Sequence, residues 1–312
     1  MKDIRIVFMG TPDFSVPVFK ALAETYNVVA VVTQPDKKTG RKQILTPSPI
    51  KLVSAEFNIP LLQPVNIKEE YEKILDYKPD MIITCAYGQI IPKQLLDYPK
   101  YKCINVHASL LPKLRGGAPI HHAIMDGYDK TGITIMYMDT KMDAGDIISQ
   151  KETKITKEDT LGTLHDRLSE MGKDLLMETL PNIISGNINP IKQDESEVTY
   201  GYNITKEDEK IDFTKTNIEV DNKVRALNPT PGAYTTLNGK RLKIYALRVS
   251  DRYYSRTTPG TIVGFEKDGI RVVAGTKEVI LTDIALEGKK RCLVKDYLNG
   301  VDKKDLLGVV LK

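Results

Sequence analysis

Short runs of apolar, often β-branched residues alternate with amphipathic stretches through the first half of the chain. The runs have strand length and predict strands at residues 4–9, 27–33, 80–86, 103–108 and 132–138. The stretches between them carry apolar residues at helical spacing and predict helices at 15–25, 49–57 and 67–77. A longer helix is predicted at 160–184, with Thr160 as its N-cap. This alternation is typical of a Rossmann-like α/β fold with a mostly parallel sheet covered by helices.

The pattern changes after Gly186. Residues 190–206 are polar, have no periodic apolar face and predict an interdomain linker. Beyond them, short apolar runs are separated by turn signals such as Asn238-Gly239 and predict a small antiparallel, OB-like β-barrel. We therefore expect a catalytic domain at 1–189, a linker at 190–206 and a C-terminal barrel domain at 207–312.

Composition narrows the class of protein. The 312 residues, 41% apolar and 28% charged, fit soluble globular domains with sizeable cores. No apolar run approaches the roughly 20 residues that cross a bilayer, and the N-terminus lacks a signal-peptide pattern, so we expect a cytoplasmic protein without a membrane partner. Three widely spaced cysteines argue against a zinc site or a disulfide framework. The net charge of +4 arises in residues 207–312, which hold 20 Lys and Arg against 15 Asp and Glu.

The first predicted strand runs into Gly10, where the loop "GTPDF" begins. A dinucleotide site would need the pattern G-x-G-x-x-G, but only one glycine is present and Pro12 removes a backbone amide that a phosphate would use. We interpret the segment from Gly10 to Phe14 as a substrate-facing loop at the carboxyl edge of the sheet.

Asn105 and His107 lie near the carboxyl end of an inner predicted strand, two residues apart. This spacing sends both side chains to the same face, at the edge where open α/β sheets bind ligands. A lone histidine is more often a hydrogen-bonded core residue. Here, however, the following "SLLPKLRGG" contains a proline and two glycines, which place a turning backbone next to the pair.

Three carboxylates follow a later predicted strand, at Asp139, Asp143 and Asp146. Such a cluster is by default a solvated turn. Asp143 differs because it lies between the apolar residues Met142 and Ala144. We regard it as a candidate partner of His107.

Five segments, in this order along the chain, resemble the methionyl-tRNA formyltransferase family. They are "MGTPDFSVPVFKAL", "TQPDKKTGRKQ", "INVHASLLPKLRGGAPI", "MDTKMDAGDI" and "VRALNPTPGAY". The resemblance covers essentially the whole chain. Its middle part is shared by enzymes that take a formyl group from 10-formyltetrahydrofolate, so it indicates the reaction more firmly than the acceptor.

The resemblance assigns roles to particular residues. The family's catalytic asparagine, histidine and aspartate fall on Asn105, His107 and Asp143. The folate-binding positions fall on Ser109, Leu110, Leu111 and Pro112, with Tyr87 and Ile90 on an apolar wall beside the pterin. Gly10 and Phe14 fall on a loop near the aminoacyl end of the acceptor. Two positions depart from the family pattern, Thr230 in place of a tryptophan and Lys42 in place of a glycine.

The resemblance also implies substrates and partners. The donor is 10-formyltetrahydrofolate as a co-substrate, with no permanently bound cofactor and no metal. The acceptor is the α-amino group of initiator methionyl-tRNA, formylated for translation initiation. Nothing in the sequence itself suggests more than a monomer. The alternative is a sugar-nucleotide N-formyltransferase with the same folate donor. Four cations within residues 37–42 favour tRNA, since a basic loop at the ligand edge suits phosphates; they are Lys37, Lys38, Arg41 and Lys42.

Overall fold

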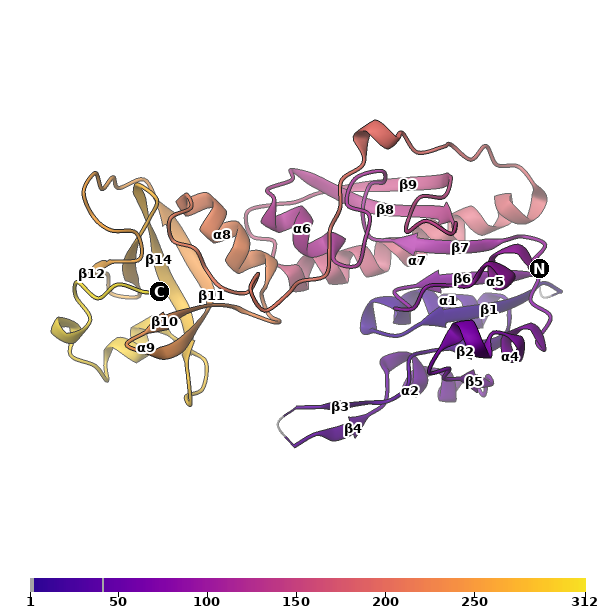
Figure 1. The fold of residues 1–312 in the computed structure, drawn as a ribbon, viewed down its shortest axis with the longest axis horizontal. Helices are drawn as coiled ribbons and strands as arrows, with labels where there is room; N and C mark the ends of the chain where they lie inside the picture. The colour runs from indigo at the N-terminus through magenta and orange to yellow at the C-terminus, as the bar shows by residue number, and fades with distance from the viewer. Residues whose placement is uncertain (1–2, 41) are drawn as a thin grey trace. The chain divides into compact units, whose positions relative to one another are not determined.

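The computed structural model describes residues 3–40 and 42–312, which divide into two compact units. The first contains residues up to 119, 130–154 and 165–202, and the second contains 120–129, 155–164 and 203–312. Figure 1 shows the α/β sheet of the first unit and the β-rich second unit. The predicted fold class, a mostly parallel α/β domain followed by a small β domain, is confirmed.

The sheet of the first unit has the strand order β5-β2-β1-β6-β7-β8-β9. The strands are β1 (Arg5–Gly10), β2 (Asn27–Val32), β5 (Leu61–Leu62), β6 (Met81–Cys85), β7 (Cys103–His107), β8 (Lys130–Tyr137) and β9 (Ile147–Lys154). The first five strands in that order run parallel, whereas β7–β8 and β8–β9 pair antiparallel. Strands β1 and β6 are buried almost throughout, as expected for parallel strands covered on both faces.

Helices flank this sheet, at α1 (Val16–Thr25), α2 (Pro49–Glu56), α3 (Ile67–Glu70), α4 (Glu72–Leu75), α5 (Lys93–Asp97) and α7 (Leu161–Ser185). The helix predicted at 67–77 is two short helices separated at Tyr71. Thr160 caps α7, because its Oγ1 accepts a hydrogen bond from Thr163 N at 3.3 Å. Gly172 of α7 lies so close to the sheet that a Cβ there would be 3.0 Å from Val106 Cγ1.

The basic segment after β2 forms a hairpin, where the sequence suggested only a loop. Strands β3 (Lys37–Thr39) and β4 (Ile44–Thr46) pair antiparallel, and all of their residues are exposed. Gly40 provides a positive φ of 68° at the turn, and its carbonyl oxygen accepts from Gln43 N. In Figure 1 this hairpin extends away from the seven-stranded sheet of its own unit.

The second unit is built on an antiparallel sheet with the order β10-β11-β14-β13-β12 and with β15 paired to β14. The strands are β10 (Ala233–Leu237), β11 (Lys240–Ser250), β12 (Ile262–Phe265), β13 (Ile270–Ala274), β14 (Lys277–Leu286) and β15 (Cys292–Leu293). The unit also contains α8 (Asn217–Ala226), α9 (Val294–Leu298) and, from residue 120, most of α6 (Pro119–Met125). Thr216 and Glu219 form a capping box that fixes the start of α8.

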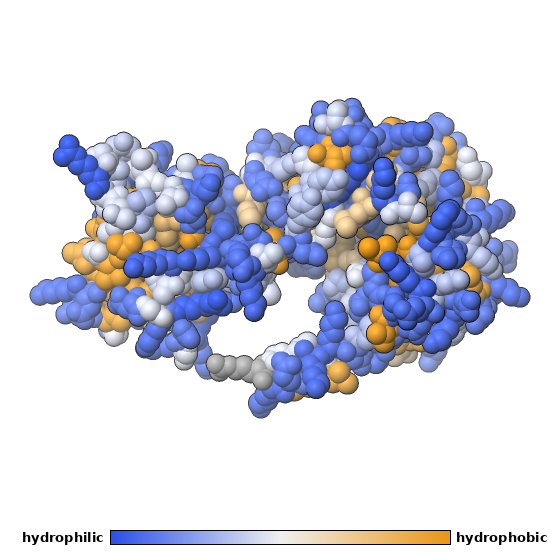
Figure 2. All heavy atoms as spheres, viewed as in Figure 1, coloured by the Kyte–Doolittle hydropathy of each residue, from blue (hydrophilic) through white to orange (hydrophobic). Residues whose placement is uncertain are grey.

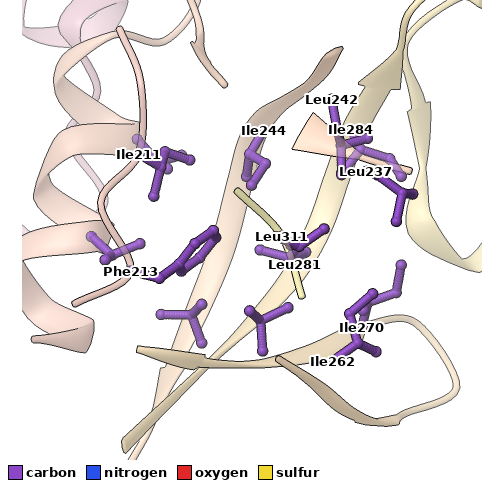
Figure 3. Close-up of a cluster of buried hydrophobic side chains, with 14 of the residues drawn as sticks. Ile211, Phe213, Leu237, Leu242, Ile244, Ile262, Ile270, Leu281, Ile284 and Leu311 are labelled. Atoms are coloured by element: carbon purple, nitrogen blue, oxygen red, sulfur yellow. The ribbon is translucent and has the colours of Figure 1, made fainter. Parts of the chain in front are cut away.

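The last five residues join the two edge strands of this sheet. Ile262 N donates to Val309 O, and Leu311 N donates to Gly260 O, on the β12 side. Thr236 of β10 exchanges two backbone hydrogen bonds with Lys312. The segment 308–312 thus closes the sheet around a core that includes Phe213, Ile244, Leu281 and Leu311 (Figure 3).

Residues 190–202 lie within the linker that the sequence predicted over 190–206, and in the structure they group with the first unit. Their backbone bonds to the segment after β7, since Arg115 N donates to Thr199 O at 2.9 Å and Gly201 N donates to Arg115 O at 2.8 Å. The polar composition that resembled a linker instead supplies hydrogen bonds to the functional site. We call residues 193–202 the strap.

Candidate active site

Asn105 lies near the carboxyl end of β7, two residues before His107. The parallel register places it beside Thr84 of β6, and Thr84 Oγ1 donates to Asn105 Oδ1 at 2.8 Å. With its oxygen engaged, the side-chain amide presents its N–H groups as donors. Asn105 is half-buried, so these donors remain accessible. Sequence reasoning did not single out Thr84, whose role follows only from the strand pairing.

His107 ends β7 and is 5% exposed. Its Nε2 lies 3.0 Å from the carbonyl oxygen of Leu114, and a carbonyl can only accept, so Nε2 carries the proton in this arrangement. Its Nδ1 faces Asp143, with 3.7 Å between Nδ1 and Oδ1. The neutral ring therefore holds a lone pair on Nδ1, and protonation there creates a cation next to the carboxylate. This is a proton acceptor paired with a group that stabilises its charged form.

Asp143 is held in a backbone conformation that is uncommon for a residue with a side chain. Its φ is +50°, and its Oδ2 accepts from Gly116 N at 2.8 Å. Gly145, two residues later, lies against β8, because a Cβ at this position would be 1.9 Å from Tyr137 O. The loop is thus fixed at Gly116 and Gly145, and it presents the carboxylate to the imidazole.

The strap supports this loop from the other side. Gln193 Nε2 donates to Asp143 O at 2.7 Å and to Gly145 O at 2.8 Å. Gln193 Oε1 accepts from the buried guanidinium of Arg115 at 2.9 and 3.0 Å, and Arg115 also pairs with Glu195. The hydrogen bond from Arg115 holds the pKa of Glu195 below its usual value. The local sequence gives no sign of this network, which joins residues 48–80 positions apart.

The predicted folate segment leaves β7 as a rigid turn. Ser109 Oγ donates to Lys113 O at 2.6 Å, and Thr134 Oγ1 of β8 donates to Ser109 O at 2.6 Å. Leu111 is fixed through both backbone groups, because its N donates to Thr134 Oγ1 and its O accepts from Gln150 Nε2. Leu110 and Pro112 belong to the same turn, which follows His107 closely along the chain.

The other predicted binding residues lie in different environments. Tyr87 is buried in an apolar cluster with a hydroxyl that has no hydrogen-bond partner among the described residues, and burial raises the pKa of this hydroxyl. Ile90 is 65% exposed. Gly10 is buried, and Phe14 packs edge-on against His165 with ring centroids 5.3 Å apart. The expected substrate-facing loop therefore has its aromatic ring turned into the protein in this conformation.

The basic loop is only partly described. Lys37, Lys38 and Lys42 are exposed and form no ion pair with the described residues, whereas Arg41 lies outside them. Figure 2 shows the hairpin covered mainly by hydrophilic residues, with a smaller hydrophobic part. Ile44 and Leu45, both well exposed, are its hydrophobic residues.

Within residues 3–40 and 42–312, no group of His, Cys, Asp and Glu side chains is arranged to hold a metal ion. No described helix is both long and apolar enough to cross a membrane.

Fold and site together define a formyltransferase. Residues 4–180 match the family model described as formyl transferase, and residues 203–302 match that of its C-terminal domain. A methionyl-tRNA formyltransferase of Bacillus subtilis is 56% identical over 313 aligned residues, which cover 98% of each chain. The chain belongs to the methionyl-tRNA formyltransferase family, as the sequence motifs predicted.

Two solved structures share the fold at low identity. The first is an N-formyltransferase from Helicobacter canadensis in complex with folinic acid and dTDP-3-aminofucose, with a TM-score of 0.66 and 20% identity; the match covers 89% of this chain and 98% of that one. The second is HypX from Aquifex aeolicus in complex with tetrahydrofolic acid, with a TM-score of 0.63 and 18% identity over 95% of this chain and 47% of that one. At these identities the likeness concerns the fold alone.

Proposed function

We propose that this enzyme transfers the formyl group of 10-formyltetrahydrofolate to the α-amino group of initiator methionyl-tRNA. The choice of methionyl-tRNA as the acceptor is supported by the similarity to a methionyl-tRNA formyltransferase, which is 56% identical over 98% of each chain. The fold alone would also suit a sugar nucleotide, which one structural neighbour binds. The residues of the site supply the chemistry that either acceptor would need.

Asn105 stabilises the charge that develops during the reaction. Attack of an amine on the formyl carbon gives a tetrahedral centre whose oxygen becomes negative, so the site must donate hydrogen bonds to that oxygen. Thr84 holds the amide oxygen of Asn105 at 2.8 Å and leaves its N–H groups for the substrate. Donors fixed in advance need no reorganisation as the charge forms.

His107 moves the proton. The attacking nitrogen must lose one proton as its bond to the formyl carbon forms, and the departing folate nitrogen must gain one as its bond breaks. With Nε2 bonded to Leu114 O, the atom of His107 that can take and return this proton is Nδ1. Asp143 Oδ1, 3.7 Å away, then stabilises the imidazolium between the two transfers. No net charge is left on the protein after one turnover.

The folate donor is assigned to the turn of Ser109 to Pro112 and to the wall around Tyr87 and Ile90. The turn is fixed by Thr134 and Gln150, so its backbone groups are already ordered before a ligand binds. Ile90 offers an exposed apolar surface three residues after the buried Tyr87. The assignment of 10-formyltetrahydrofolate as the particular folate donor rests on the family resemblance.

Two basic surfaces are assigned to the tRNA. The β3–β4 hairpin carries Lys37, Lys38 and Lys42 into solvent, where each can contact a phosphate. The barrel domain has 20 Lys and Arg against 15 Asp and Glu, a surplus that suits the tRNA body. The tRNA would then be bound by surfaces that are distinct from the catalytic residues of β7.

A direct assay tests this function. The purified protein is incubated with 10-formyltetrahydrofolate and either methionyl-tRNA or a nucleotide-linked amino sugar, and formylated product is measured for each. We expect formyl-methionyl-tRNA and no formylated sugar. Product from the amino sugar alone would reassign the acceptor, and product from neither would refute the proposed reaction.

A further inference from the structure

The carbonyl oxygen of Leu114 selects the tautomer of His107. This oxygen lies 3.0 Å from His107 Nε2. Only the tautomer with its proton on Nε2 can donate to a carbonyl, and the other tautomer would set two lone pairs against each other. Leu114 is 2% exposed, so loss of this hydrogen bond would be costly for its buried carbonyl. The position of this carbonyl therefore decides which nitrogen of His107 is left to accept a proton.

The peptide group that contains this carbonyl is also bonded to the strap. Peptide groups are planar, and in a trans group the C=O and the N–H point to opposite sides. In the trans group between Leu114 and Arg115, the oxygen bonds to His107. The N–H of the same group donates to Thr199 O at 2.9 Å. The imidazole and the strap therefore bond to one rigid group from its two sides.

The next peptide group repeats this arrangement with the other member of the candidate pair. In the group between Arg115 and Gly116, the N–H donates to Asp143 Oδ2 at 2.8 Å. The oxygen of this group accepts from Gly201 N of the strap, also at 2.8 Å. Two consecutive peptide groups thus connect His107 and Asp143 to the strap.

Thr199 holds Leu114 through two hydrogen bonds. Its Oγ1 accepts from Leu114 N at 2.9 Å, and its backbone oxygen accepts from Arg115 N. Leu114 has a φ of +60°, which is uncommon for a residue with a side chain and persists where surrounding contacts enforce it. The two bonded N–H groups flank the Cα atom of Leu114, so Thr199 fixes the direction in which the Leu114 carbonyl points.

We propose that Thr199 is a positioning residue that sets the tautomer of His107. By fixing the peptide groups on both sides of Leu114, Thr199 keeps the carbonyl on Nε2, and Nδ1 remains the nitrogen that accepts a proton opposite Asp143. This proposal rests on the proposed function, in which Nδ1 takes and returns the proton of the attacking amine. Thr199 thereby differs from Gln193, whose side chain places the carboxylate loop.

Formylation kinetics measure the effect on the chemistry. Thr199→Val removes the hydroxyl, and this variant should fold because Thr199 is exposed. With the Leu114 carbonyl less tightly held, kcat should fall about tenfold, since small misplacements of reacting groups are costly. The KM values for both substrates should stay the same, because the change affects proton transfer rather than binding. Thr199→Ser keeps the hydroxyl and should retain the wild-type kcat.

The tautomer itself is observed by ¹⁵N NMR of protein labelled in its four histidines. The spectra are recorded near pH 9, well above the ordinary histidine pKa of about 6.5. Comparison with His107→Ala identifies the signals of His107. The wild type and Thr199→Ser should carry the proton on Nε2 alone, whereas Thr199→Val should show a second form with the proton on Nδ1. This measurement needs no substrate.

Ser196→Ala is the matched control within the strap. Ser196 Oγ donates to Asp194 Oδ1 at 2.7 Å, which is a bond between two strap residues, so the variant should keep the wild-type kcat and tautomer. A wild-type kcat or an unchanged tautomer in Thr199→Val would overturn the proposal, and so would an equal loss of kcat in Ser196→Ala. If the wild type does not formylate methionyl-tRNA, the proposed function fails, and the NMR spectra still decide whether Thr199 sets the tautomer.

Discussion

Gln193 Nε2 donates hydrogen bonds to the backbone oxygens of both Asp143 and Gly145, at 2.7 and 2.8 Å. A single side-chain amide thus secures both ends of the short segment that carries the candidate catalytic carboxylate. Because its Oε1 accepts from the buried Arg115, the same amide connects that segment to the loop after β7. The geometry of the His107–Asp143 pair therefore depends on a residue 50 positions away from Asp143 in the sequence.

Gln193→Ala should slow formylation without removing any catalytic group. Loss of the bonds to Asp143 and Gly145 frees the carboxylate loop, and we expect kcat to fall about tenfold or more, since small misplacements of reacting groups are costly. Steady-state kinetics check this. Gln63→Ala is the control, because Gln63 Nε2 also donates two hydrogen bonds, to Gln34 O and Asp36 Oδ1. If both variants keep the wild-type kcat, the strap does not position Asp143.

Gly145→Ala should destabilise the first unit. A Cβ at this position would lie 1.9 Å from Tyr137 O, so β8 or the loop must shift. We expect the free energy of unfolding to fall by about 1–3 kcal/mol or more, as in overpacked cores, and activity to fall with it. Thermal unfolding and the formylation rate measure both effects. Gly300→Ala, where the nearest atom to a new Cβ is 3.8 Å away, should change neither. Wild-type stability in Gly145→Ala would contradict the close contact.

Glu278 should make the stability of the second unit depend on pH. Its side chain is 1% exposed and accepts hydrogen bonds from Arg271, Tyr254 and Ser250. Burial alone would raise the pKa of Glu278, but these hydrogen bonds hold the pKa below its usual value. The ionised Glu278 carboxylate therefore stabilises the folded protein fully above the unfolded-state pKa of a glutamate, about 4.3. This stabilisation is lost as the pH falls through the lower pKa that Glu278 has in the folded protein.

Glu278→Gln tests this dependence. Without the charge, the free energy of unfolding at pH 7 should fall by about 1–3 kcal/mol, and the difference from wild type should shrink as the pH falls below about 4. Denaturant unfolding at several pH values measures both. Glu266→Gln, which removes a more exposed partner of Arg248, should have a small effect. An unchanged difference between pH 7 and pH 3.5 would show that the charge of Glu278 is not the cause.

Replacing Lys38 and Lys42 by alanine tests the assignment of the hairpin. If each lysine contacts a phosphate, the slope of log K for tRNA binding against log salt should decrease by about 0.7–0.9 for each. The KM for methionyl-tRNA should rise at a fixed salt concentration, and the KM for the folate should stay the same. Lys68→Ala, an exposed lysine of α3 in the same unit, is the control. An unchanged slope in the double variant would leave the hairpin without a role in tRNA binding.

The sequence predicted the elements whose burial shows in the local pattern of apolar residues. The buried strands β1, β2, β6 and β7 were predicted because short apolar runs separated by amphipathic stretches are typical of a parallel sheet covered by helices. Strand β9 was missed because none of its residues is buried, and the β3–β4 pair because its residues are all exposed. Neither has the periodic burial that the prediction used.

The candidate site divides in the same way. Asn105, His107 and Asp143 stood out through their motifs, and the structure places His107 and Asp143 together. Thr84, Gln193 and Arg115 did not, because their roles are hydrogen bonds to residues far away in the sequence. A polar segment with no periodic face resembles a linker until its partners are known. The catalytic roles themselves stay predictions until they are measured.

The single-turnover rate of methionyl-tRNA formylation by His107→Ala, with both substrates saturating, tests the role of His107 most directly. The variant should fold and should bind both substrates as the wild type does. Its rate should be lower by about 10²-fold or more, since proton transfer by a positioned side chain contributes at least this much. A wild-type rate in a folded His107→Ala protein would contradict the assignment of proton transfer to His107.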